Sequence, residues 1–473
     1  SAKQLASQHR AGTKACTESL RDKLKLIKSH NPKINALVSV ESERATSEAT
    51  RLDKLAKEST SRLGRLHGLA FSAKLNIDVA NFPTSDGSAT RPPAIAKHNN
   101  RLVELLTQEG AFCIGKGNMP EYGKSTFVTS NKIYGQTNNP FHLGYVPGGS
   151  TGGDAAALAA GFCDFSIGGD SGGSLRVPAN FCGIFGMLPT HGTISAGPAN
   201  LMSGTFTRTF GSSGPLARNL DDLELLYAIL SGFNPADSSS VPSPTVPNES
   251  ATKKFAYYNE IDAVHADFRI QKTLKETVEK FESLGYQGVE ICPAPIVESL
   301  EPFVILAGQA SLLQEDIIAQ RSGNPRKLER ESDIIKALRS RIKAELPPLT
   351  AETLLHFQYE AERVRSEMNV WFKGFDFIIC PTAACTPPKH HTQSFFINGN
   401  GYESYQVFHF ARAFNLLQLP AIAFPTSIGD DGLPLGLQIA GPRFSDRKLF
   451  QILRAGGFTN CIPSPSLSNN PQK

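Results

Sequence analysis

GGDSGGSLRVPANFCGIFGMLPTHG, residues 168–192, is the stretch that most restricts the fold, together with PGGSTGGDAAALAAG, residues 147–161. Glycine pairs precede Ser174 in the first stretch and Ser150 in the second. Both stretches are rich in glycine and polar residues, but apolar runs such as AAALAAG and CGIFGML interrupt them. A flexible linker would lack such runs. The composition therefore predicts ordered backbone that folds through tight turns.

Around these stretches, short apolar runs alternate with helical segments. LAFSAKLNI (69–77) and AFCIGKG (111–117) have strand character, and RLVELLTQEG (101–110) has helical character. This alternation is typical of an α/β protein. We expect one large domain over residues 1–473. It would consist of N-terminal helices in 1–65, a core in 66–230 and the rest of the sheet in 231–473, with a helical excursion at about 300–372.

The overall composition limits the classes of partner. The 473 residues are 40% hydrophobic and 19% charged, with a net charge of +4 and no long run of one sign. A nucleic-acid surface would need clustered Lys and Arg. The opening SAKQLASQHR lacks the apolar core of a signal peptide, and no run approaches the roughly 18 apolar residues that cross a bilayer. We expect a soluble, cytoplasmic protein that binds neither nucleic acid nor membrane.

The eight cysteines are scattered, and several lie in apolar runs such as AFCIG and FIICP. This pattern is typical of buried free thiols in a reducing compartment. Cys380 and Cys385, followed by His390 and His391, form the one cluster that invites a metal interpretation. Their spacing fits no common zinc pattern. We therefore expect no metal and no cofactor.

Three short motif matches point to other enzymes. Gly148–Gly152 matches the G-x-S-x-G nucleophile elbow, but the preceding NNPFHLGYVP contains two prolines and no strand. Gly169–Gly173 matches the GDSGG of chymotrypsin-like proteases, but His67 has no cysteine beside it. Gly110–Gly117 resembles a phosphate-binding loop, but a glycine replaces the Ser or Thr that would hold magnesium. We expect none of these three activities.

Lys74 stands alone in the apolar segment LAFSAKLNI. Burial penalises a charged lysine, so this residue must find a partner or lose its proton. An isolated strand lysine is commonly an edge or snorkelling residue. Ser150 and Ser174 favour a functional role, because a serine hydroxyl needs a base within hydrogen-bond reach. No histidine occurs between these two serines.

Together these segments resemble the amidase signature family from His67 to about Leu453. The lysine segment of that family corresponds to His67-Gly-Leu-Ala-Phe-Ser-Ala-Lys74-Leu75. The other matching blocks, in chain order, are GKGNMPEYG, YGQTNNP, PGGSTGGDAAALAAG, GGDSGGSLRVPANFCGIFGMLPTHG, GPLAR, FDFIICPT, FNLLQLPAIAFP and DGLPLGLQIAGP. So many ordered matches make the resemblance specific.

The resemblance implies a single α/β/α domain, with a large, mostly parallel mixed sheet surrounded by helices and a site at the ends of central strands. It also implies a catalytic triad. Ser174 would be the nucleophile that forms an acyl-enzyme. Ser150 would stand between Ser174 and Lys74, with the Gly149–Ser150 peptide bond in the cis form.

The implied chemistry is consistent with the residue types. A neutral Lys74 can take a proton from Ser150, which takes one from Ser174, and the reverse relay gives the leaving nitrogen its proton. We expect the backbone N–H groups of Ser171, Gly172, Gly173 and Ser174 to face the oxyanion.

Three further residues are expected to support the site. Asp170 and Arg176 flank Ser174, and they would fix its loop through charge-assisted hydrogen bonds or form a structural ion pair. Thr151 replaces a second family serine and can keep the same hydrogen bond. One departure concerns Leu75, where the family usually has aspartate; Asn76 or Asp78 would then have to supply that function.

The sequence thus favours an amidase that hydrolyses a small carboxylic amide. It is compatible with a homodimer. A catalytically silent docking module is one alternative, although such a member would be expected to lose the lysine or a serine. A second is the amidase subunit of a tRNA-dependent amidotransferase, but TFTRTFGSSGPLAR (205–218) departs from the Ser-Ser-Leu-Asp-Gln-like run expected there. The family resemblance implies that the N-terminal helices and residues 300–410 form the pocket walls.

Overall fold

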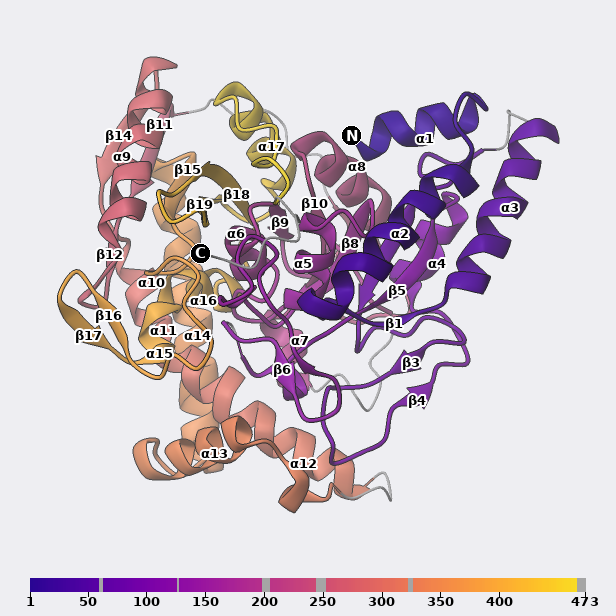
Figure 1. The fold of residues 1–473 in the computed structure, drawn as a ribbon. Coiled ribbons are helices and arrows are strands. Elements are labelled where there is room, and N and C mark those ends of the chain that lie inside the picture. The colour runs from indigo at the N-terminus through magenta and orange to yellow at the C-terminus, as the bar shows by residue number, and fades with distance from the viewer. Residues whose placement is uncertain (59–62, 126, 198–204, 244–251, 322–325, 466–473) are drawn as a thin grey trace.

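The computed structural model describes residues 1–58, 63–125, 127–197, 205–243, 252–321 and 326–465. Its centre is an eleven-stranded sheet (Figure 1). In spatial order the strands are β1 (Leu37–Val40), β5 (Phe112–Gly117), β2 (Ala70–Lys74), β8 (Phe165–Asp170), β10 (Ser212–Ala217), β9 (Phe185–Leu188), β18 (Ala421–Ile428), β19 (Pro434–Ala440), β15 (Phe377–Pro381), β11 (Lys254–Tyr257) and β14 (Gln287–Glu290).

The sheet is mixed, as expected, and its parallel pairs form two blocks. Strands β5, β2 and β8 form one block, and β15, β11 and β14 form the other. The other six of the ten neighbouring pairs are antiparallel, more than we expected. Short connections explain the pair β18–β19, because a parallel pair needs a crossover of a dozen or more residues. Between Ile428 and Pro434 there is room only for a hairpin.

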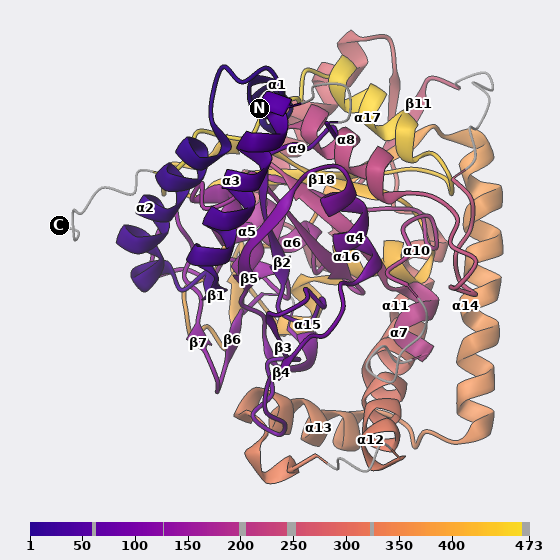
Figure 2. The same cartoon turned by 90° about the vertical axis from the view of Figure 1, so that its right-hand side faces the viewer.

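Helices cover both faces of this sheet (Figures 1 and 2). Those outside the helical excursion are α1 (Ala2–Arg10), α2 (Cys16–Ile34), α3 (Ser42–Glu58), α4 (Arg101–Gln108), α5 (Gly152–Ala159), α6 (Arg176–Phe181), α7 (Thr205–Phe210), α8 (Leu220–Leu230), α9 (Phe268–Ser283), α15 (Ser404–Val407), α16 (His409–Leu416) and α17 (Asp446–Ala455).

The alternation of side chains along the strands divides the core in two. On β2, Ala70 joins the cluster that includes Leu20 of α2 and Leu158 of α5. Phe71, the next residue, joins the larger cluster on the other face with Leu102 of α4. The α/β class and the layered arrangement inferred from the sequence are therefore confirmed.

Residues 294–371 form the helical excursion. Its elements are α10 (Ala294–Glu298), α11 (Leu300–Phe303), a π-helical turn (Val304–Ala310), α12 (Ser311–Arg321), a 3₁₀ turn (Leu328–Arg330), α13 (Asp333–Glu345) and α14 (Ala351–Trp371). Both views place α12 and α13 at the end of the molecule opposite α17 (Figures 1 and 2).

Four two-stranded ribbons and two 3₁₀ turns complete the described structure. The ribbons are β3 (Pro83–Thr84) with β4 (Ala94–Ile95), β6 (Ser130–Asn131) with β7 (Gly135–Gln136), β12 (Glu260–Ile261) with β13 (Val264–His265), and β16 (Phe395–Ile397) with β17 (Asn400–Tyr402). The turns are Glu121–Gly123 and Phe372–Gly374.

One helical stretch, Ala294–Gln314, is long and apolar enough to cross a bilayer by length and composition alone. We expected no such stretch from the sequence. In the structure, 56% of its most apolar window is buried inside the protein, as in the core helix of a globular protein. The stretch is therefore weak evidence for a membrane span.

Strands β2 and β8 are parallel neighbours, so their C-terminal ends lie at the same edge of the sheet. Lys74 is the last residue of β2, and Asp170 is the last residue of β8. The segment that carries Ser174 begins immediately after Asp170. The topology thus brings residues that are about 100 positions apart in sequence to one edge of the sheet.

Candidate active site

Lys74 and Ser150 are joined at this edge by a hydrogen bond. Lys74 Nζ donates to Ser150 Oγ at 2.7 Å, and both residues are buried. Burial lowers the pKa of Lys74 to about 8, against the opposing attraction of Asp154 and Asp170. A substantial share of the amine is therefore neutral near physiological pH.

Ser150 lies in a tight turn before α5. The Gly149–Ser150 peptide bond is cis, as expected from the family resemblance. A Cβ on Gly149 would lie 2.7 Å from the carbonyl oxygen of Ser125, which is closer than a real Cβ contact. Glycine at this position therefore allows the close approach of two backbone segments.

Thr151 links this turn to the segment that carries Ser174. Its backbone N–H donates to the carbonyl oxygen of Ser174 at 3.2 Å. Its Oγ1 donates to the carbonyl oxygen of Gly169 on β8 at 3.3 Å. Ser150 and Ser174 both line the cavity that contains Lys74. The structure thus brings the three predicted triad residues to one cavity.

The carboxylate of Asp170 organises the turn around Ser174. It accepts hydrogen bonds from the backbone N–H groups of Gly172 (3.2 Å), Gly173 (2.6 Å) and Leu175 (3.1 Å). It also forms an ion pair with Arg176, whose Nε lies 3.0 Å away, and neither side chain is exposed to solvent. Burial raises the pKa of Asp170, but the charge of Arg176 and these N–H groups outweigh it and lower the pKa to about 2.

This arrangement changes the expected oxyanion site. The N–H groups of Gly172 and Gly173 point at Asp170 Oδ1, so they are occupied in the structure. The N–H groups of Ser171 and Ser174 are not engaged by this carboxylate. Of the four donors expected from the sequence, these two are the ones that the Asp170 carboxylate leaves for an oxyanion.

Asp154, on α5, is a site residue that the sequence analysis missed. Its side chain is fully buried, and its Oδ1 accepts a hydrogen bond from Ser72 Oγ at 2.7 Å. Its Oδ2 has no hydrogen-bond partner among the described residues. The carboxylate packs against Gly117, the strand partner of Lys74, where a Cβ would lie 2.2 Å from the Asp154 carboxyl. An aspartate inside the alanine-rich run GGDAAALAAG was the available signal.

Leu75 stands where the family usually has an aspartate, so another carboxylate must act on Lys74 if that function is kept. Leu75 is fully buried, and Asn76 and Asp78 line the cavity. The negative charges that raise the pKa of Lys74 belong to Asp154 and Asp170, and Asp78 is not among them. Burial raises the pKa of Asp154 itself to about 7, although Ser72, Lys116 and Lys74 oppose this shift.

A cavity of about 760 Å³ opens over these groups. The π-helical turn contributes Val304, Ala307 and Gly308 to its wall, and α13 contributes Leu338 and Ile342. Walls from residues 300–410 were expected and are present. The expected contribution of the N-terminal helices is wrong for the described residues, because no lining residue precedes Lys74.

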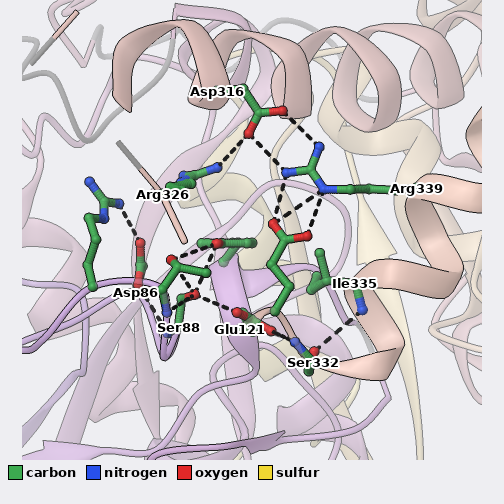
Figure 3. Close-up of polar contacts among 12 residues, drawn as sticks. Asp86, Ser88, Glu121, Asp316, Arg326, Ser332, Ile335 and Arg339 are labelled. Carbon is green, nitrogen blue, oxygen red and sulfur yellow. Dashed lines mark hydrogen bonds and ion pairs between the residues drawn. The ribbon is translucent and has the colours of Figure 1, made fainter. Parts of the chain in front are cut away.

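A polar network attaches the excursion to the core above this cavity (Figure 3). Arg339 forms ion pairs with Asp316 and with Glu331, at 2.8 and 2.9 Å. The backbone N–H of Ser332 donates to Glu121 Oε2 at 2.7 Å. Because Glu331 and Glu121 are both buried, these contacts hold α12 and α13 in a defined position over the site.

The two cysteines of the sequence cluster that invited a metal interpretation lie in the interior of the protein. Cys380 and Cys385 are buried free thiols. Within the described ranges, no group of three or more His, Cys, Asp or Glu residues is arranged to hold a metal ion.

Known proteins resemble this chain both in sequence and in fold. A model of the Amidase family matches residues 18–450. The chain is similar to one subunit of the glutamyl-tRNA(Gln) amidotransferase from Cyanothece sp., with 29% identity over 96% of this chain and 95% of that protein.

Two solved structures share the fold. 6-Aminohexanoate cyclic dimer hydrolase has a TM-score of 0.85 and 23% identity, and the match covers 99% of this chain and 98% of that one. A structure described as an amidase has a TM-score of 0.81 and 25% identity, and the match covers 96% and 98%.

Proposed function

The chain belongs to the Amidase family of amidase signature enzymes, and we propose that it hydrolyses the C–N bond of a small carboxylic amide. Ser174 is the nucleophile in this proposal, and the acyl group passes through an ester on its Oγ. Ammonia or an amine leaves, and water then releases the carboxylic acid.

The proton path in this proposal starts at Lys74. The neutral amine takes a proton from Ser150, which takes one from Ser174 as its oxygen attacks the carbonyl carbon. When the tetrahedral intermediate collapses, the relay returns the proton to the leaving nitrogen. In this proposal the N–H groups of Ser171 and Ser174 stabilise the oxyanion. Losing one such donor typically costs about 3–4 kcal/mol.

The observation that carries the proposal is the 2.7 Å hydrogen bond from Lys74 Nζ to Ser150 Oγ, in a cavity that Ser174 also lines. A buried amine of lowered pKa beside a hydroxyl can activate a nucleophile without a histidine. The family membership supports the same chemistry.

Labelling with a fluorophosphonate tests the assignment of the nucleophile. We expect one adduct, mapped to the peptide that contains Ser174 and abolished by Ser174→Ala. Ser171→Ala, which changes a neighbouring serine of the same cavity, is the matched control and should still be labelled. An adduct on Ser150 or Ser171, or full turnover of an amide panel by Lys74→Ala, would overturn the proposal.

A second candidate function is the amidase component of an amidotransferase, favoured by the similarity to such a protein over nearly the whole chain. In that case the ammonia released from an amide would be used by a partner protein. Purification of the untagged native protein decides between the two. A stable complex with a different chain would support the amidotransferase, whereas an active protein of one chain type would support the free-standing amidase.

A further inference from the structure

Arg412 lines the cavity without a carboxylate partner among the described residues. It lies on α16 and is half-buried. Its Nη1 donates to the carbonyl oxygen of Tyr405 at 2.6 Å, and its guanidinium lies 5.8 Å from the centre of the Phe303 ring. Neither contact neutralises its charge.

The other arginines of the cavity wall differ from Arg412 in this respect. Each forms an ion pair with a carboxylate: Arg91 with Asp86, Arg208 with Asp237, Arg326 with Asp316, and Arg341 with Glu345. Their charges are therefore largely balanced within the protein.

Arg412 is also in an unfavourable electrostatic position. Burial and the nearby charge of Arg341 lower its pKa to about 10, so the guanidinium remains protonated at neutral pH. A partly buried cation without a nearby counter-charge is in an unfavourable position, and an anion that entered the cavity would relieve it. A guanidinium presents paired N–H donors that match a carboxylate.

Phe303 connects this cation to the nucleophile turn. Its ring packs against Gly172, where a Cβ would lie 2.8 Å from its Cζ. Phe210 packs against the same ring, with 5.9 Å between the ring centres. From the serine turn towards Arg412, the cavity wall therefore changes from backbone N–H groups to aromatic carbon and then to a cation.

We propose that the amide substrate carries a carboxylate at the end of a short hydrocarbon spacer, and that Arg412 binds this carboxylate while Phe303 and Phe210 contact the spacer. This inference rests on the proposed amidase function and names its substrate class. Arg412 acts here in binding and specificity, and takes no part in the proton relay.

Matched pairs of primary amides test the proposal. Hexanamide and adipamic acid have the same six-carbon chain and differ by a terminal carboxylate; butanamide with succinamic acid and pentanamide with glutaramic acid form the shorter pairs. We expect the wild-type kcat/KM to be higher for the carboxylate of at least one pair, with the preferred length reporting the spacing.

Two substitutions and a control locate the effect. Arg412→Met is expected to lower kcat/KM for the carboxylate by roughly 10- to 100-fold, and to lower it much less for the neutral amide. Arg412→Lys, which keeps the charge, should restore part of the preference. Arg91→Met removes an arginine of the same cavity that is paired with Asp86, and the ratio between the two substrates should stay within about twofold.

The outcomes separate this inference from the proposed function. If the wild-type enzyme cleaves both members of every pair equally, or if Arg412→Met lowers both rates by the same factor, the carboxylate site is wrong while the amidase function stands. If no amide is cleaved and no serine is labelled, the amidase function fails. Thermal stabilisation by adipate, present in the wild type and lost in Arg412→Met, would then still support the carboxylate site, and its absence would overturn it.

Discussion

Replacing Asp170 by asparagine tests how the turn around Ser174 is held. The carboxylate receives hydrogen bonds from four backbone N–H groups and from two side-chain nitrogens of Arg176. Asparagine has nearly the same shape, but its NH₂ group would face N–H donors, and the buried charge of Arg176 would lose its counter-ion.

The expected loss is large because both side chains are fully buried. Breaking a buried ion pair by removing one partner typically costs about 3–5 kcal/mol of the free energy of unfolding. Arg176 would keep only neutral partners, Gln438 Oε1 at 2.8 Å and Asn415 Oδ1 at 2.6 Å. We therefore expect Asp170→Asn to lower the free energy of unfolding by an amount in this range. We also expect it to slow fluorophosphonate labelling of Ser174.

Urea unfolding of four proteins measures the effect: the wild type, Asp170→Asn, Arg176→Met and the double variant. Because the double variant has no unpaired buried charge, its loss should be smaller than the sum of the single losses by about 1–3 kcal/mol. A loss below about 1 kcal/mol for Asp170→Asn, or strict additivity, would refute the view that this ion pair holds the turn.

Two further predictions concern the proton relay. In the proposed relay the neutral form of Lys74 is the base, and burial lowers the pKa of Lys74 to about 8. We therefore expect kcat/KM to fall about tenfold per pH unit below that value. A flat profile between about pH 6 and 9 would contradict this. Asp154→Asn removes a negative charge that raises the pKa of Lys74, so the acidic limb of the profile should move to lower pH. Asp78→Asn is the control, and an equal shift in both variants would argue against a specific effect of Asp154.

Part of the site could be predicted from sequence because it depends on residue type and on local backbone geometry. The glycines around Ser150 and Ser174 mark turns in which backbone segments approach closely, and a lysine in an apolar strand signals a perturbed amine. The roles of Asp170 and Arg176 were also within reach, since both lie within four residues of Ser174.

Other features depended on contacts between distant segments. Asp154 raises the pKa of Lys74, because α5 packs beside β5. The presence of Leu75 after Lys74 gave no indication of this distant carboxylate. The antiparallel pairs β10–β8 and β18–β9 lie between the two parallel blocks and join strands that are far apart in the chain. The cavity walls were misassigned in part because sequence does not show that α1 to α3 pack away from the site.

The sequence by itself determined the family, the α/β class and the three residues proposed for the triad, because those depend on residue type, order and local backbone geometry. Only the tertiary structure decided which carboxylates act on Lys74 and which backbone N–H groups remain for an oxyanion. It also showed that Arg412 has no carboxylate partner within the described part of the chain. Electrostatic interactions depend on distance and burial, and segments far apart in the chain set both of these.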